Sequence, residues 1–110
     1  MSSEFHTERE NTVARFAPGQ RVQIPCKVQQ GPFPSEFLVT FETVEGPVSG
    51  FVREQDFRRV GEGSGYIFAT VEEVGEDTLS VMVRGSFFRT TGLAHLSRDW
   101  ANSHVEAAPA

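Results

Sequence analysis

The sequence predicts an all-β fold, a small and partly open barrel of five or six strands with one short helical turn. Apolar and polar residues alternate along several segments, and turns that contain Gly separate those segments. One hairpin pattern also occurs twice, because FETVE at 41–45 is answered by FATVE at 68–72. In both copies a Ser-x-x-Val-Arg segment follows, ending at Arg53 and Arg84. Such repeated hairpins favour a barrel or sandwich and leave little room for a buried catalytic site.

Five segments alternate strongly enough to be expected as strands, and a sixth is shorter. Their ranges are 21–28, 37–43, 48–53, 66–74 and 79–83, with 86–89 as the candidate sixth strand. Pro25 cannot donate a ladder hydrogen bond, so the first strand is expected at a sheet edge, or bent or bulged there. A short helical turn is expected over 54–59, where Phe57 would plug one end of the barrel. Ser97 can cap a closing helical turn over 98–100.

A chain of 110 residues is expected to form one domain. Polar and charged segments without periodicity predict disordered tails over 1–12 and 103–110, which leaves a single β-barrel domain over 13–102. Ten Phe residues stand against one Trp and one Tyr. Because Phe supplies a large apolar area without a polar atom to satisfy, most of them are expected in the core.

The formal net charge is -5, but much of it lies in the two tails, so the body of the domain is almost balanced. Such a balance neither demands nor forbids a nucleic-acid partner. Cys26 is the single cysteine and cannot form an intrachain disulfide. The first residues lack the apolar run of a secretory signal, and no segment approaches the roughly 20 apolar residues that span a bilayer. The sequence therefore predicts a cytoplasmic protein without a membrane partner.

The residues that usually carry catalysis or bind metals are scattered along the chain. His6, His95, His104 and Cys26 show no spacing typical of a metal site. Cys26 falls on the inward row of an apolar strand, where burial keeps a thiol protonated. No G-x-S-x-G motif occurs, and GEGSG at 61–65 lacks the Lys and the following helix of a phosphate-binding loop. We therefore expect no catalytic residues, no metal and no cofactor.

Aromatic and arginine residues form the one constellation that indicates binding. Phe87 and Phe88 are adjacent, so in a strand their side chains point to opposite faces and one of them is expected outside the core. Alternatively both pack, one in the core and one under the C-terminal turn. An exposed aromatic ring beside Arg can stack a base or anchor a protein contact. The candidate ligand-binding residues are Phe33, Arg53, Arg84, Phe87, Phe88 and Arg89.

Several short motifs follow one another in the order of a known module. A Gly before the first strand (GQRV at 19–22) is followed by a Gly-Phe loop and an apolar strand (GPF at 31–33, FLV at 37–39). GFV at 50–52 then leads into a short helical segment, and a hairpin over 71–83 closes the pattern. Together these motifs span about two-thirds of the chain. They resemble the RNA-binding OB-fold domains of the ribosomal small-subunit type, which are also appended to polynucleotide phosphorylase.

The resemblance implies an OB-like barrel that binds single-stranded RNA. Its binding face would map onto Phe33, Phe37 and Arg53, and Arg53 stands where the family commonly has His. The same hairpins also fit a five-stranded Src-homology-like barrel. Both topologies therefore stay open at the level of the sequence.

The expected function is that of a non-catalytic binding module. Two classes of ligand compete for the aromatic and arginine residues: a protein partner or a second copy of this chain, and single-stranded nucleic acid. Ten Lys and Arg residues against fifteen acidic ones are a poor electrostatic start for binding phosphate. We therefore favour a protein–protein interaction or self-association and keep an RNA-binding OB-like domain as the alternative.

Overall fold

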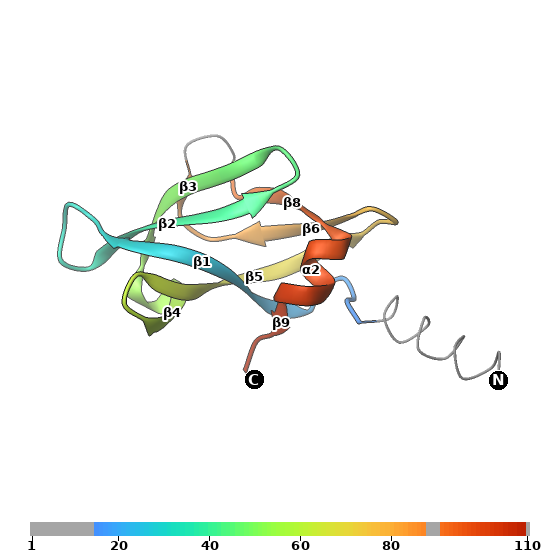
Figure 1. Ribbon diagram of the computed structural model, residues 1–110, viewed down its shortest axis with the longest axis horizontal. Coiled ribbons are helices and arrows are strands. Elements are labelled where there is room, and N and C mark those ends of the chain that lie inside the picture. Colours follow the sequence, from blue (N-terminus) through green and yellow to red (C-terminus); the bar gives the residue numbers. More distant parts are fainter. Residues whose placement is uncertain (1–14, 88–90, 110) are drawn as a thin grey trace.

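The computed structural model describes residues 15–87 and 91–109 (Figure 1). Its strands are β1 (Arg21–Gln30), β2 (Glu36–Thr43), β3 (Gly46–Arg53), β4 (Phe57–Gly61), β5 (Ser64–Val74), β6 (Thr78–Val83), β7 (Ser86–Phe87), β8 (Leu93–Ser97) and β9 (Glu106–Ala107). A 3-10 turn, η1 (Glu54–Asp56), and an α-helix, α2 (Arg98–His104), complete the described part. The strands form one curled antiparallel sheet in the order β7-β3-β2-β1-β5-β6-β8, with β4 paired to β5 and β9 paired to β1. The predicted all-β, partly open barrel is confirmed.

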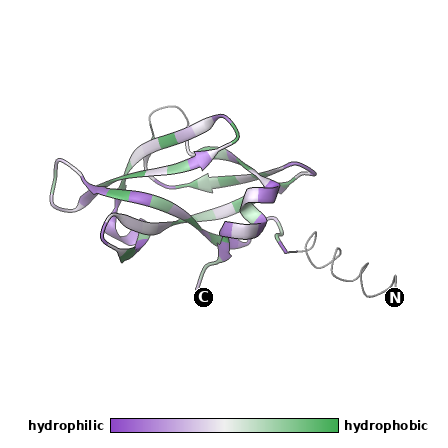
Figure 2. Cartoon of the chain, viewed as in Figure 1, coloured by the Kyte–Doolittle hydropathy of each residue, from purple (hydrophilic) through white to green (hydrophobic). Residues whose placement is uncertain are grey.

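The inner face of the sheet is built from the apolar rows that the alternation predicts. Val22 and Ile24 of β1 are fully buried, and so are Ile67 and Val71 of β5. Figure 2 shows apolar and polar residues following one another along the strands. Burying one such aliphatic side chain contributes about 1.5–3 kcal/mol. The other fully buried strand residues include Val39, Leu79, Val81 and Leu96.

Pro25 lies in a strand that is not at the edge of the sheet, because β1 runs between β2 and β5. The Val28 N–H donates to the Gly63 carbonyl beside β5 at 3.0 Å, so the nitrogens of alternate residues in β1 face β5 and that of Pro25 faces the other edge. On that edge β9 pairs with the start of β1, and β2 takes over only at Lys27. Pro25 therefore falls in a gap between two partner strands, where its missing donor removes no ladder bond.

β5 changes its partner along one edge. With 11 residues it is the longest described strand, and it pairs with β1 along its other edge. Ile67 pairs with Phe57 of β4, whereas Ala69 pairs with Val83 of β6. Phe68 is thus the residue at which β4 and β6 part.

The helical turn expected over 54–59 is shorter than predicted. Only η1 is helical, and the chain continues directly as β4. Phe57 is buried, and its ring centroid lies 4.9 Å from that of Phe37. Residues 57–61 form a strand because β4 pairs with β5. The sequence does not indicate this strand, because two charged residues follow Phe57 and interrupt the apolar alternation.

A short connection joins β6 to β7, the strand at the opposite end of the sheet order. Only Arg84 and Gly85 separate these strands, and β7 pairs with β3 through Gly50 and Phe87. A Cβ atom on Gly50 would lie 2.7 Å from the Ser86 carbonyl oxygen and would run into the Phe87 ring. Glycine at this position therefore lets β7 pair closely with β3 at one edge of the partly open barrel.

The C-terminal part contains more structure than the sequence predicts. β8 pairs with β6, and α2 packs against both strands. The Ser97 hydroxyl accepts a hydrogen bond from the Trp100 N–H at 3.3 Å, which confirms the predicted helix cap. Val105 is fully buried and β9 pairs with β1, so the disordered tail expected over 103–110 is wrong for residues 103–109. None of the described helices is long and apolar enough to cross a membrane. The tail expected over 1–12 lies outside the described residues.

Replacing Gly50 by Ala should destabilise the fold by about 1–3 kcal/mol, because the added methyl group overpacks the contact between β3 and β7. Gly61→Ala is the matched control, since a Cβ atom there meets no atom within 4 Å. The control should be neutral or stabilising by up to about 1 kcal/mol. Denaturant unfolding followed by circular dichroism measures both. Equal stability of the two variants would contradict the close contact between β3 and β7 at Gly50.

Candidate binding face

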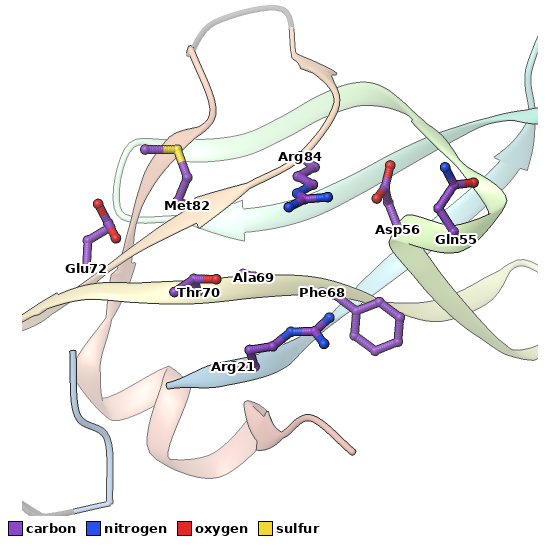
Figure 3. Close-up of a pocket in the computed structure, with 9 residues that line it drawn as sticks. All are labelled: Arg21, Gln55, Asp56, Phe68, Ala69, Thr70, Glu72, Met82 and Arg84. Atoms are coloured by element: carbon purple, nitrogen blue, oxygen red, sulfur yellow. The ribbon is translucent and has the colours of Figure 1, made fainter. Parts of the chain in front are cut away.

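A hollow of about 600 Å³ lies over Phe68, where β4 and β6 part (Figure 3). Arg21 of β1 and Arg84 after β6 line it together with Asp56 of η1 and Glu72 of β5. Figure 3 shows the Arg21 side chain next to the Phe68 ring, with Asp56 at one end of the hollow and Glu72 at the other. The hollow thus combines an aromatic ring with two positive and two negative side chains.

Phe68 faces outward because of its place in the alternation of β5. Its neighbours Ile67 and Ala69 are buried, which turns the half-buried Phe68 to the opposite face. The Arg21 guanidinium carbon lies 5.6 Å from the centroid of the Phe68 ring, within the range of a cation–π contact. The outer side of this ring is therefore partly covered by a cation of the same chain.

A second hollow, of about 430 Å³, lies between the β1–β2 loop and η1. Phe33 stands in this loop with 63% of its surface exposed, beside Arg53 at the end of β3. The loop is held at its base, because the Gln30 side-chain amide donates to the Phe33 carbonyl at 3.2 Å and the Glu36 N–H donates to the same carbonyl at 3.0 Å. Phe33 is thus an exposed aromatic side chain on a braced loop.

Gln55 lines both hollows and makes them parts of one surface. We call this surface the η1 face and define it by Phe33 and Arg53 on one side of Gln55 and by Phe68 and Arg84 on the other. Its charges are nearly balanced, because three arginines stand against four carboxylates. These residues are Arg21, Arg53 and Arg84, and Glu36, Glu54, Asp56 and Glu72.

The structure places three of the six predicted site residues on the η1 face. Phe33 and Arg53 share one hollow, and Arg84 lines the other. Phe87 instead packs against the core, with its ring centroid 5.9 Å from that of Phe41 in an edge-to-face contact. Phe88 and Arg89 lie outside the described residues.

Sequence reasoning missed the residues that join the two hollows. Gln55 carries no signal of its own, and Phe68 belonged to a strand whose inward row was not assigned. Phe37, which the family resemblance maps to a binding face, is buried against Phe57. The inward position of Phe37 was already visible from its alternation with Val39 and Phe41.

Cys26, the single cysteine of the chain, is buried in the core and lines neither hollow. Burial raises the pKa of the Cys26 thiol to about 12, opposed in part by a hydrogen bond with the backbone of Ile67, so this thiol stays protonated at neutral pH. Among residues 15–87 and 91–109, no three His, Cys, Asp or Glu side chains gather where they could hold a metal ion.

A separate polar cluster lies on the same outer side of β5, next to β9. The Tyr66 hydroxyl is hydrogen-bonded to the Glu106 side chain, and the Arg58 guanidinium carbon lies 4.9 Å from the centroid of the Tyr66 ring. The hydrogen bond to Glu106, followed by the negative charge of that carboxylate, raises the pKa of Tyr66 above its usual value of 10. The cluster ties the C-terminal segment to the barrel.

Glu106→Ala should lower the pKa of Tyr66 toward 10, because the variant lacks both the acceptor and its charge. A pKa raised in the folded state stabilises the fold at a pH below 10 and loses that contribution as the pH rises through the folded-state value. Tyr66 is the single tyrosine of the chain, so phenolate absorbance during a pH titration reports this group alone. A titration midpoint that Glu106→Ala leaves unchanged would contradict the contact.

Comparison with known proteins assigns no family to this fold and face. No protein-family model matches the chain, and neither a curated protein nor a solved structure matches it.

Proposed function

We propose that the protein is a cytoplasmic, non-catalytic binding module whose η1 face holds an extended segment of a protein partner. The observation that carries this proposal is the position of Gln55 between two hollows. Each hollow offers an aromatic ring and an arginine: Phe33 with Arg53, and Phe68 with Arg84. Two side chains of one extended segment would enter the two hollows, with Gln55 facing the main chain between them.

The balance of charge favours a protein segment over a phosphate backbone. A nucleic acid gains most of its affinity from basic side chains that neutralise phosphates. On the η1 face the carboxylates, such as Asp56 and Glu72, offset the arginines. A peptide can present both signs of charge, and each sign then meets its complement.

The aromatic side chains support the same choice of ligand. Phe33 is 63% exposed on a braced loop, so it would lose little conformational freedom on entering a protein contact. Aromatic and arginine side chains are the types that dominate the energetics of protein interfaces. Phe68 is less suited to stacking a base, because the Arg21 guanidinium already lies over its ring.

Peptides selected from a displayed random library on the full chain provide the probe for this proposal. Phe33→Ala and Arg84→Ala should each weaken a selected peptide about tenfold or more, because each removes an anchor from one hollow. Glu76→Ala is the matched control, since Glu76 is an exposed residue that lines neither hollow, and it should leave the affinity within about twofold.

Two outcomes would overturn the proposal. One is that no selected peptide loses affinity in both anchor variants. The other is that a labelled single-stranded oligoribonucleotide binds the chain, with an affinity that falls steeply as salt rises and is lost in Phe33→Ala and Arg84→Ala. That second result would assign the same face to RNA, as the family resemblance implies.

A further inference from the structure

The edge of β1 ahead of Pro25 is occupied by the C-terminal segment of the same chain. β9 pairs there through Glu106 with Gln23 and through Ala107 with Val22. The Ala108 N–H extends the contact by donating to the Arg21 carbonyl at 3.0 Å. The segment therefore lies on β1 as an added strand, in the manner of a peptide bound to a sheet edge.

The buried side chain of Gln23 in β1 donates a hydrogen bond to the main chain of this segment. Gln23 is only 5% exposed, and its amide nitrogen donates to the Ala107 carbonyl at 3.2 Å. Its amide oxygen accepts a hydrogen bond from Arg58 Nε at 3.1 Å, which fixes the orientation of the amide. Gln23 thus presents a pre-oriented donor to whichever strand lies on this edge, independent of the side chains of that strand.

Two further contacts depend on the side chains of the segment. Val105 is fully buried, so the position ahead of the strand accepts an apolar residue. The next position, Glu106, places a carboxylate on the Tyr66 hydroxyl. Ala107 follows as a small, exposed residue. A strand on this edge is therefore recognised by its main chain through Gln23 and by an acidic residue at the place of Glu106, whereas Val105 anchors the chain's own segment in the core.

The strand itself is lightly held. β9 makes two residue pairs with β1, and both of its side chains are exposed. By comparison, β5 pairs with β1 at seven positions. Local opening is easiest where few buried contacts are lost, so residues 106–109 belong to the part of the fold that opens first.

We propose that this edge of β1 is a second binding site, which accepts an extended segment of a partner protein with an acidic residue at the place of Glu106, in exchange for β9. β9 is the occupant within the chain, and its Glu106 shows which side chain the partner must carry. The site lies apart from the η1 face, so it stands or falls independently of the function proposed there.

A labelled peptide with the sequence of residues 103–109, SHVEAAP, tests the site on the full chain. Ala108→Pro removes the N–H that binds Arg21 and favours release of β9, whereas the matched control Ala108→Ser keeps that N–H. Because apparent affinity follows the fraction of open sites, the Pro variant should bind the peptide about tenfold more tightly than the Ser variant. Equal affinities in the two variants would overturn the proposal.

The side-chain selectivity has its own control. In the Ala108→Pro background, Tyr66→Phe should weaken SHVEAAP several-fold and leave a peptide with Ala in place of Glu unchanged, because only the first peptide carries the carboxylate. Loss of both peptides to the same degree would overturn the predicted preference for an acidic residue. Concentration-dependent dimers of the wild-type chain, abolished by added peptide, would assign the site to a second copy instead of another protein.

Hydrogen exchange on the wild-type chain tests the opening without any variant. The Ala108 amide donates to the Arg21 carbonyl, and the Val28 amide of β1 donates to the Gly63 carbonyl. The Ala108 amide should exchange at least about tenfold faster than the Val28 amide, because β1 is flanked by β2 and β5. Equal protection of the two amides would mean that β9 opens only when the whole barrel unfolds, and the site would then be closed to any partner.

Discussion

The pairing of β5 with two strands along one edge is the constraint from which the rest of the structure follows. Ile67 is paired with β4 and Ala69 with β6, so those two strands must part at Phe68. The chain reaches β4 through the 3-10 turn η1. After β6 the chain continues as β7, which pairs with β3. The hollow over Phe68, the position of Gln55 and the return of the chain to β3 are therefore consequences of one register.

Two glycines allow neighbouring strands to approach each other closely. Gly65 lies at the start of β5, where a Cβ atom would be 2.6 Å from the Arg58 carbonyl oxygen in β4. Gly50 plays the same part where β7 reaches β3. The two glycines permit contacts on either side of η1, so the surface around it is shaped by backbone positions as much as by side chains.

The sequence predicted those strands that bury a full row of apolar residues, and it failed where a strand buries few. β4 buries only Phe57 and then presents charged residues, so it was read as a helical turn. β8 buries only Ala94 and Leu96, which is too short an alternation to separate from a loop. β9 buries neither of its two residues, so no apolar alternation marks it in the sequence.

The repeated hairpin pattern predicted the fold class, but matching residues of the two copies do not pack alike. Phe41 and Phe68 occupy matching places in the two copies, yet Phe41 is buried and Phe68 faces outward. Val44 and Val71 likewise differ, because Val44 is 49% exposed just beyond the end of β2 and Val71 is buried within β5. The likeness reflects strand composition and not equivalent packing, and so the outward aromatic residue of the second copy went unrecognised.

The register of β5 gives the most direct test of this account. Nuclear Overhauser contacts in the free chain should join backbone protons of Ile67 to Phe57 and of Ala69 to Val83. Both sets should appear together, because β4 and β6 flank Phe68 in the same molecule. Contacts from Ile67 to Gly85 in place of those to Phe57 would show that β6 continues past Ala69, and would remove the hollow and the η1 face with it.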